Sequence, residues 1–257
     1  MLRSRVIPCL LIRNKGLVKT VKFKEGKYVG DPLNAVKIFN EKEVDELIVL
    51  DIDATRASGE PDFHMIEKMA SECRMPFCYG GGVTTKEQAR KIISLGVEKV
   101  ALSASIVHNP ELVREIAREI GGQSVVAILD VKKKLIGSKY EIWTHNATKN
   151  TGKCPVQFAR VLERMGVGEI VVNSINNDGV MKGYDLNIVR RIRETIKVPM
   201  TVLGGAGSVD HIKELVHTYD VIGAAAGSLF VFKGSYKAVL INYLSENDAS
   251  LIHRLKA

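Results

Sequence analysis

Aspartates occur at the ends of several apolar runs in this sequence, a position where catalytic residues are common in α/β barrels. The run VVAILDV carries Asp130 near its end. We expect burial to raise the pKa of this carboxyl group toward the range that suits a general acid or base. A helix-capping or loop-anchoring role is the alternative. Three more candidates at run ends have the same alternative: Asp51, Asp53 and Asp178.

Glycine-rich turns occur twice, as Gly80-Gly81-Gly82 and as Gly204-Gly205-Ala206-Gly207. The next apolar run is followed by Ser103 and Ser105 in the first case and by Ser228 in the second. Backbone N–H groups that no side chain covers bind phosphate well, above all beside a helix N-terminus. Tight turns without a ligand are the alternative. The symmetric recurrence favours a ligand with a phosphate at each end. The candidate binding residues are Asp51, Asp178, Gly81, Gly82, Ser103, Ser105, Gly179, Gly204, Gly205, Gly227 and Ser228.

Other charged residues have less specific surroundings. Lys19 lies in a long loop, where it could contact a phosphate or a carboxylate, and a solvated loop lysine is the alternative.

Four residues, Arg5, Glu46, Lys99 and Glu169, lie at the starts of apolar runs. In a barrel they would converge at the end opposite the aspartates and form a salt-bridged ring. The usual meaning of such a ring is that it closes the barrel floor.

Short apolar runs alternate with amphipathic stretches along the whole chain. Such strands, when linked by helices, indicate a parallel sheet covered on its outer face. Eight units of this kind in 257 residues predict an α/β protein with one domain over residues 1–257, a closed (β/α)8 TIM barrel. The predicted strands are residues 6–12, 46–52, 76–80, 99–103, 125–131, 169–175, 199–204 and 220–226.

The two halves of the chain repeat one another. A shift of 123 places aligns the glycine pair 81–82 with the pair 204–205 without a gap, and it aligns Glu46 with Glu169 and Ser105 with Ser228. This register predicts two duplicated (β/α)4 units. The opening strands align at a slightly different offset, which places Leu11 on Asp130.

Two connections, residues 13–31 and 132–153, are longer than usual and occupy equivalent places in the halves. Loops of this length are usually functional, so we expect both at the C-terminal mouth of the barrel, where catalysis occurs. In the first, the alternation Val-Lys-Thr-Val-Lys-Phe followed by Lys-Tyr-Val predicts a small hairpin.

Composition excludes several classes of protein. The four cysteines include no C-x-x-C pair and have no histidine at ligand spacing, so we expect neither a metal site nor disulfides. The longest early apolar run has seven residues, too few for a signal peptide or a membrane span. We therefore expect a cytoplasmic protein without membrane segments. The net charge of +8 lacks interleaved aromatics, which argues against nucleic acid.

Together these residues resemble the cyclase subunit of imidazole glycerol phosphate synthase, the HisF family, over nearly the whole chain. The motifs that carry the resemblance are residues 5–10, 46–52, Pro76 with 80–82, 149–152, 177–179, 183–185 and 204–207. The family is a (β/α)8 barrel without a cofactor. It takes ammonia from a glutaminase subunit docked on its floor and uses it at the mouth to close an imidazole ring on a bisphosphorylated ribulosyl substrate.

The resemblance assigns roles to the candidates. The ring of Arg5, Glu46, Lys99 and Glu169 becomes an ammonia gate, and Asp130 becomes one of two acid–base aspartates. Leu11 stands where the second aspartate is expected. The loss of a general acid or base typically costs roughly 10²–10⁴-fold in rate. Other departures at the mouth are Asn14 for an aspartate, Asn173 and Ala104 for threonines, and Leu203 for a serine.

The chain keeps the four gate residues but lacks one of the two aspartates. In this it resembles HisF-like paralogues associated with sugar amidation in surface-polysaccharide synthesis. In that hypothesis the barrel relays ammonia to a third protein, a sugar amidotransferase that converts an acetamido group to an acetamidino group. The first alternative is a cyclase of histidine biosynthesis in which Asp51, Asp178 or Lys19 replaces the missing group. The second is a non-catalytic scaffold that only activates a glutaminase.

Overall fold

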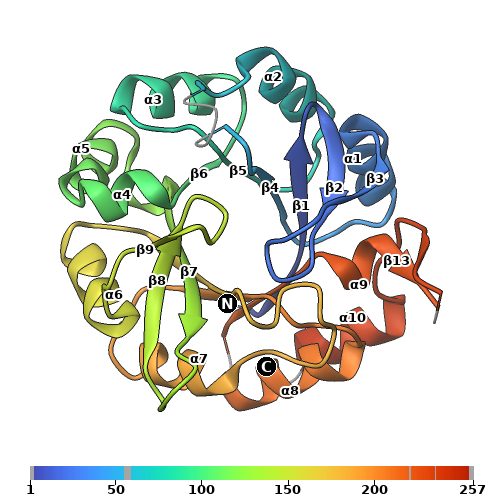
Figure 1. Cartoon of the computed structure of the whole chain (residues 1–257). Helices are drawn as coiled ribbons and strands as arrows, with labels where there is room; N and C mark the ends of the chain where they lie inside the picture. The colour runs from blue at the N-terminus through green and yellow to red at the C-terminus, as the bar shows by residue number, and fades with distance from the viewer. Residues whose placement is uncertain (1–2, 55–58, 220, 235, 255–257) are drawn as a thin grey trace.

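The computed structural model describes residues 3–54, 59–219, 221–234 and 236–254. Its centre is a closed barrel of parallel strands, in which the last strand pairs with the first. Figure 1 looks along the barrel axis and shows the helices as a ring around the strands. The barrel strands are β1 (Arg5–Arg13), β4 (Leu47–Asp51), β5 (Phe77–Gly80), β6 (Lys99–Leu102), β7 (Val125–Lys133), β10 (Glu169–Ser174), β11 (Met200–Leu203) and β12 (Gly223–Ala226). The predicted (β/α)8 barrel is confirmed.

Helices follow the barrel strands and cover the outside of the sheet. The longer ones are α1 (Pro32–Glu41), α2 (Phe63–Glu72), α3 (Lys86–Ser94), α5 (Glu111–Ile120), α6 (Pro155–Arg164), α7 (Leu186–Arg193), α8 (Val209–Tyr219) and α10 (Glu246–Arg254). Short helical turns are α4 (Ala104–His108), η1 (Gly122–Ser124) and α9 (Ser228–Val231). No helix in the described residues is long and apolar enough to cross a membrane.

Capping side chains explain where several helices begin. Asp31 accepts a hydrogen bond from the Asn34 N–H at 2.9 Å at the start of α1, and Thr85 and Gln88 form a reciprocal capping box at the start of α3. At the start of α2, Asp62 accepts a hydrogen bond from the Met65 N–H at 3.0 Å. The predicted last strand begins at Asp220, which lies outside the described residues, and β12 itself begins at Gly223.

Both long connections form hairpins at the mouth of the barrel. In the first, β2 (Gly16–Lys19) pairs with β3 (Lys27–Gly30), and in the second, β8 (Tyr140–Thr144) pairs with both β7 and β9 (Lys149–Asn150). The alternation predicted over residues 18–23 stops at Lys19, because Lys22 and Phe23 adopt positive φ angles of 52° and 61°. A last small hairpin joins β13 (Phe232–Lys233) and β14 (Ala238–Val239).

Apolar side chains form two separate layers. The larger layer packs the outer face of the strands against the helices, and the smaller one fills the barrel itself. Because successive side chains of a strand point to opposite faces, each barrel strand contributes to both layers. We call the inner layer the interior cluster; it consists of Ile7, Cys9, Ile48, Cys78, Ala101, Val126, Ile128, Val171, Leu203 and Ala225, with Leu11 and Leu50 packed against it.

Candidate functional site

A cavity of about 540 Å³ opens at the C-terminal ends of the barrel strands. Its base is formed by the upper side chains of the interior cluster, and its walls come from the two hairpin connections and the strand ends. Asp130 and Leu11 both line it, as do Lys19, Asp51 and Asp178. The structure therefore brings together candidates from distant parts of the sequence in a site large enough for a small phosphorylated ligand.

Asp130 lies on β7 and accepts hydrogen bonds from Asn173 of the neighbouring strand β10 and from Ser103, which follows the neighbouring strand β6. The Asn173 amide donates to one carboxylate oxygen at 2.9 Å, and the Ser103 hydroxyl is 3.3 Å from the other. Burial raises the pKa of Asp130 to about 7, although both hydrogen bonds act in the opposite direction. A carboxyl group with this pKa can take up or release a proton near neutral pH. The other Asn173 side-chain atom, Oδ1, is buried without a partner in the described residues.

Leu11 faces the same cavity from β1, where it pairs with Leu50 of β4. With Ile128 and Leu203 these leucines make the base of the cavity apolar. Leucine has no group that exchanges protons, so the side of the cavity formed by β1 offers no acid or base at this position.

Lys19 is buried and its ammonium group lies 2.8 Å from Asp178. The Asp178 carboxylate also accepts from the Thr20 hydroxyl at 2.8 Å and from the Phe23 N–H at 3.3 Å. Lys19 therefore contacts a carboxylate, one of the two partners expected from the sequence. Asp178 acts as an anchor for the first hairpin, which fixes the wall of the cavity.

The carboxylates of Asp51 and Asp53 also fix the positions of loops at the mouth through hydrogen bonds. Asp51 accepts hydrogen bonds from the Asp53 and Ala54 N–H groups, each at 3.1 Å, and burial raises its pKa. Asp53 accepts from Arg13 at 2.9 Å and from Asn146 at 3.3 Å, so it joins the two long connections across the mouth. The loop-anchoring alternative fits both residues, although Asp51 also lines the cavity.

The two glycine clusters lie where the duplication predicts. Gly81 and Gly82 line the cavity beside Ser103 and Ser105. The second cluster lines a small adjoining hollow. Gly205 approaches a backbone oxygen, that of Gly183, so closely that a side chain would not fit. The residues of the second cluster are Gly179, Gly204, Gly205, Gly227 and Ser228, with Lys19 and Asp178 beside them.

Sequence reasoning missed several cavity residues on the mouth loops. His145 and Asn146 line the cavity from a turn in which they and Ala147 all have positive φ angles, between 54° and 59°. Arg13 and Gln88 also line it. The length of the second connection was the only signal for this turn, because no glycine marks the three left-handed positions.

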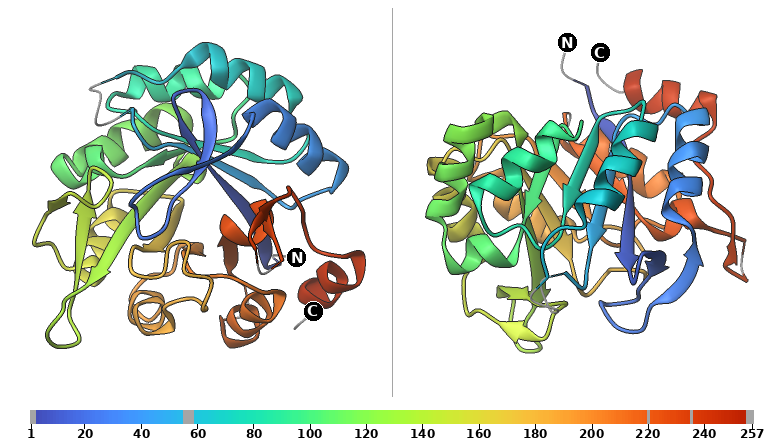
Figure 2. Two further views of the ribbon diagram at one scale, coloured as in Figure 1. Left: turned by 45° about the vertical axis from the view of Figure 1, so that its right-hand side comes forward. Right: turned by 90° about the horizontal axis from the view of Figure 1, so that it is seen from above.

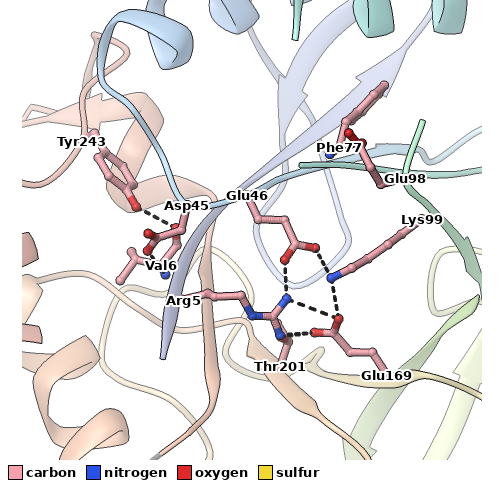
Figure 3. A network of polar contacts seen from close by, with 10 residues as sticks. All are labelled: Arg5, Val6, Asp45, Glu46, Phe77, Glu98, Lys99, Glu169, Thr201 and Tyr243. Carbon is pink, nitrogen blue, oxygen red and sulfur yellow. Dashed lines mark hydrogen bonds and ion pairs between the residues drawn. The ribbon is translucent and has the colours of Figure 1, made fainter. Parts of the chain in front are cut away.

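At the opposite end of the barrel, four charged side chains form a ring (Figure 3). Arg5 pairs with Glu46 and, at 2.8 Å, with Glu169. Lys99 lies 2.7 Å from Glu46 and 2.9 Å from Glu169. The Thr201 hydroxyl donates to Glu169 at 2.6 Å. The predicted convergence at the barrel floor is therefore present, and each charge has two partners of opposite sign.

Charge pairing dominates the electrostatics of this ring. Burial alone would raise the pKa of Glu169, but the attraction of Arg5 and Lys99 outweighs it and lowers that pKa to about 2. Burial opposes the charge on Lys99, yet Glu169 and Glu46 raise its pKa. Glu169 and Lys99 are therefore both charged at neutral pH.

Between the ring and the cavity, the barrel is filled by the interior cluster. Its titratable members are Cys9 and Cys78, and burial raises the pKa of both thiols, to about 12 for Cys9. The core of the barrel therefore carries no ionised side chain. In the described residues there is no group of three or more His, Cys, Asp or Glu side chains that could hold a metal ion.

Comparisons with known proteins place these features in context. A family model described as histidine biosynthesis protein matches residues 5–237. A Vibrio vulnificus protein, provisionally named imidazole glycerol phosphate synthase subunit hisF3, is 61% identical over 248 residues, which are 96% of this chain and 95% of that protein. A Leptospira interrogans protein, also provisionally named as the HisF subunit, is 52% identical over 96% of this chain and 98% of its own length. An Exiguobacterium sibiricum protein named as this subunit without qualification is 36% identical over 83% of this chain and 85% of its own length.

Proposed function

The chain belongs to the histidine biosynthesis protein family as a HisF-type barrel, and from this premise we propose that it is the synthase subunit of a glutamine amidotransferase. A glutaminase subunit docks on the floor, and its ammonia enters the barrel through the ring of Arg5, Glu46, Lys99 and Glu169. The ammonia leaves at the mouth cavity. Its acceptor is an acetamido sugar, which a sugar amidotransferase converts to an acetamidino sugar.

Passage through the barrel is supported by the interior cluster. Its members are apolar or uncharged, because burial keeps the thiols of Cys9 and Cys78 protonated. Ammonia that crosses such a core remains uncharged, since no side chain of the interior cluster readily supplies a proton. Asp130 stands at the end of this path with a pKa of about 7, where it can exchange protons with the nitrogen.

The choice of acceptor rests on one observation: Leu11 lines the mouth cavity where the family has an aspartate, while the four ring residues at the floor are all present. Cyclisation needs two proton-handling groups, and of the expected pair only Asp130 is present. Asp178 does not replace the second, because its carboxylate is paired with Lys19 and holds the first hairpin. Asp51 holds backbone N–H groups of the loop that follows it.

The names of the relatives are compatible with this choice. The two more similar ones are named as HisF subunits only provisionally, whereas the unqualified HisF subunit is 36% identical. Histidine-pathway cyclisation remains the second candidate, because the cavity and the hollow beside it each keep a glycine cluster next to a serine. A non-catalytic activator of a glutaminase is the third.

Two binding measurements test the proposal. A HisH-type glutaminase is titrated with this chain, and a bisphosphorylated ribulosyl ligand is titrated separately. Binding of the glutaminase by the chain is the expected result. A chain that binds no glutaminase contradicts the proposal. Binding of the glutaminase without any phosphorylated ligand, including nucleotide-linked acetamido sugars, supports the activator instead.

A further inference from the structure

The positive charge of this chain is concentrated in the two long connections. Residues 13–31 and 132–153, which we call the basic rim, contain twelve of the 37 Lys and Arg residues but only three of the 29 Asp and Glu residues. The basic rim therefore has a net charge of +9, while the remainder of the chain has a net charge of −1. The charge of +8 is therefore carried by the basic rim, and the rest of the chain is close to neutral.

Most of these charges are available to a partner. Four of the twelve basic residues form ion pairs with carboxylates: Arg13, Lys15, Lys19 and Lys134. The other eight have no carboxylate partner among the described residues. Of the twelve, only Arg13 and Lys19 line the mouth cavity. Seven of the eight lysines without a carboxylate partner are exposed, and Lys132 is half-buried. These lysines would contact a large object at the mouth and not a small ligand in the cavity.

The tip of the second hairpin adds apolar side chains to this charge. Leu135 is fully exposed and Ile136 is 91% exposed, between Lys134 and Lys139 in the sequence. The two side chains together form an apolar patch at the tip, and exposed apolar patches rimmed by polar residues mark interaction sites. In the first connection, Val21 and Tyr28 are also exposed.

The hairpin that carries this tip is held in place. Arg191 of α7 donates to the Ser138 carbonyl at 2.8 Å, and the Tyr140 hydroxyl donates to Asp185 at 2.9 Å. Lys132 lies over the Trp143 ring. The right-hand view of Figure 2 shows both hairpin connections projecting at the end of the barrel opposite the chain termini. A flat surface that approaches the mouth would meet these hairpins first.

We propose that the basic rim binds an anionic lipid surface, with Leu135 and Ile136 inserted among the headgroups. Lysines outside the cavity attract the negative surface potential, and aliphatic side chains flanked by lysines are the usual composition of an interfacial anchor. Protein interfaces are instead depleted in lysine, which disfavours an acidic protein as the occupant. The floor faces away from the lipid in this orientation, so a glutaminase could bind there at the same time.

The test is sedimentation of the full chain with vesicles. Vesicles of phosphatidylcholine mixed with phosphatidylglycerol are compared with phosphatidylcholine alone, each at low and high salt. We expect retention only on the anionic vesicles and release by salt. Leu135→Ser with Ile136→Ser and, separately, Lys133→Glu with Lys139→Glu should each weaken retention by about tenfold or more.

Matched controls lie outside the basic rim. Lys42→Glu, at the end of α1, with Lys68→Glu, on α2, makes the same charge change elsewhere, and Leu251→Ser removes an exposed leucine from α10. Both should leave retention within about twofold of the wild type. Equal losses in the charge control and in the rim variant overturn the proposal, because net charge alone would then explain binding. Failure of the wild type to bind anionic vesicles also overturns it and leaves an acidic protein as the occupant.

Discussion

The side-chain amide of Asn173 donates a hydrogen bond of 2.9 Å to the carboxylate of Asp130, its direct neighbour across strands β10 and β7. The resemblance to the HisF family led us to expect a threonine at position 173. An amide donor stabilises the ionised form of the carboxylate. The residue therefore opposes the effect of burial, which alone would raise the pKa of Asp130 further.

Replacing this donor should shift the proton affinity of Asp130. Asn173→Leu removes the hydrogen bond, so the pKa of Asp130 should rise above its value of about 7. Ser103→Ala removes a longer contact of 3.3 Å and should have a smaller effect. Titration of the labelled carboxyl carbon by NMR measures both. A fall in this pKa in Asn173→Leu would refute the assignment of the donor.

Stability should also depend on the ionisation of Asp130. Its pKa is raised from 3.8 to about 7 in the folded state, so the folded chain binds the proton more tightly than the unfolded chain. The free energy of unfolding therefore decreases as pH rises from 3.8 to 7, and the penalty is complete above 7. At pH 8, Asp130→Asn should be more stable than the wild type by at most about 4 kcal/mol. Urea unfolding at several pH values measures this, with Asp210→Asn as an exposed control that should follow the wild type.

The pairing of Lys19 with Asp178 predicts a strong coupling. Lys19→Met leaves a buried carboxylate without its cation and should cost about 3 kcal/mol of unfolding free energy. Asp178→Leu leaves a buried ammonium group and should cost a similar amount. The double variant should lose much less than the sum of the two. Additive losses in urea unfolding would mean that the two groups do not interact in solution.

The floor ring should stabilise the protein in an acid-sensitive way. The pKa of Glu169 is lowered from 4.5 to about 2 in the folded state, so its contribution is complete above 4.5 and is lost as pH falls toward 2. Glu169→Gln should therefore reduce the unfolding free energy at neutral pH by roughly 3 kcal/mol, with the difference shrinking in acid. Glu67→Gln, on the exposed side of α2, is the control. A constant difference at all pH values would contradict the pairing.

The barrel was predictable because each of its strands carries a nearly continuous apolar run, and the helices carry caps such as Asp31 and Thr85. The repeat in the sequence also predicted that the two glycine clusters would lie beside serines. These features follow from local sequence patterns, which can be recognised without knowing the tertiary contacts.

Contacts between distant loops were not predictable. Asp53 joins Arg13 to Asn146, and Asp178 holds the first hairpin, because the closed barrel brings these residues to one rim. The residues next to Asp53 and Asp178 in the sequence do not indicate which distant residues these carboxylates contact. The left-handed turn at His145 was missed for a related reason, since three residues without a glycine rarely adopt positive φ angles.

The most direct test of the account is ammonia-dependent turnover of the ribulosyl bisphosphate substrate of HisF by the wild type and by Leu11→Asp. The account predicts that the wild type is slower than a HisF cyclase by about 10²–10⁴-fold. Leu11→Asp should recover part of this activity, because Asp130 and both glycine clusters are already in place. Turnover by the wild type at the rate of a HisF cyclase would contradict the claim that the barrel relays ammonia to a different acceptor.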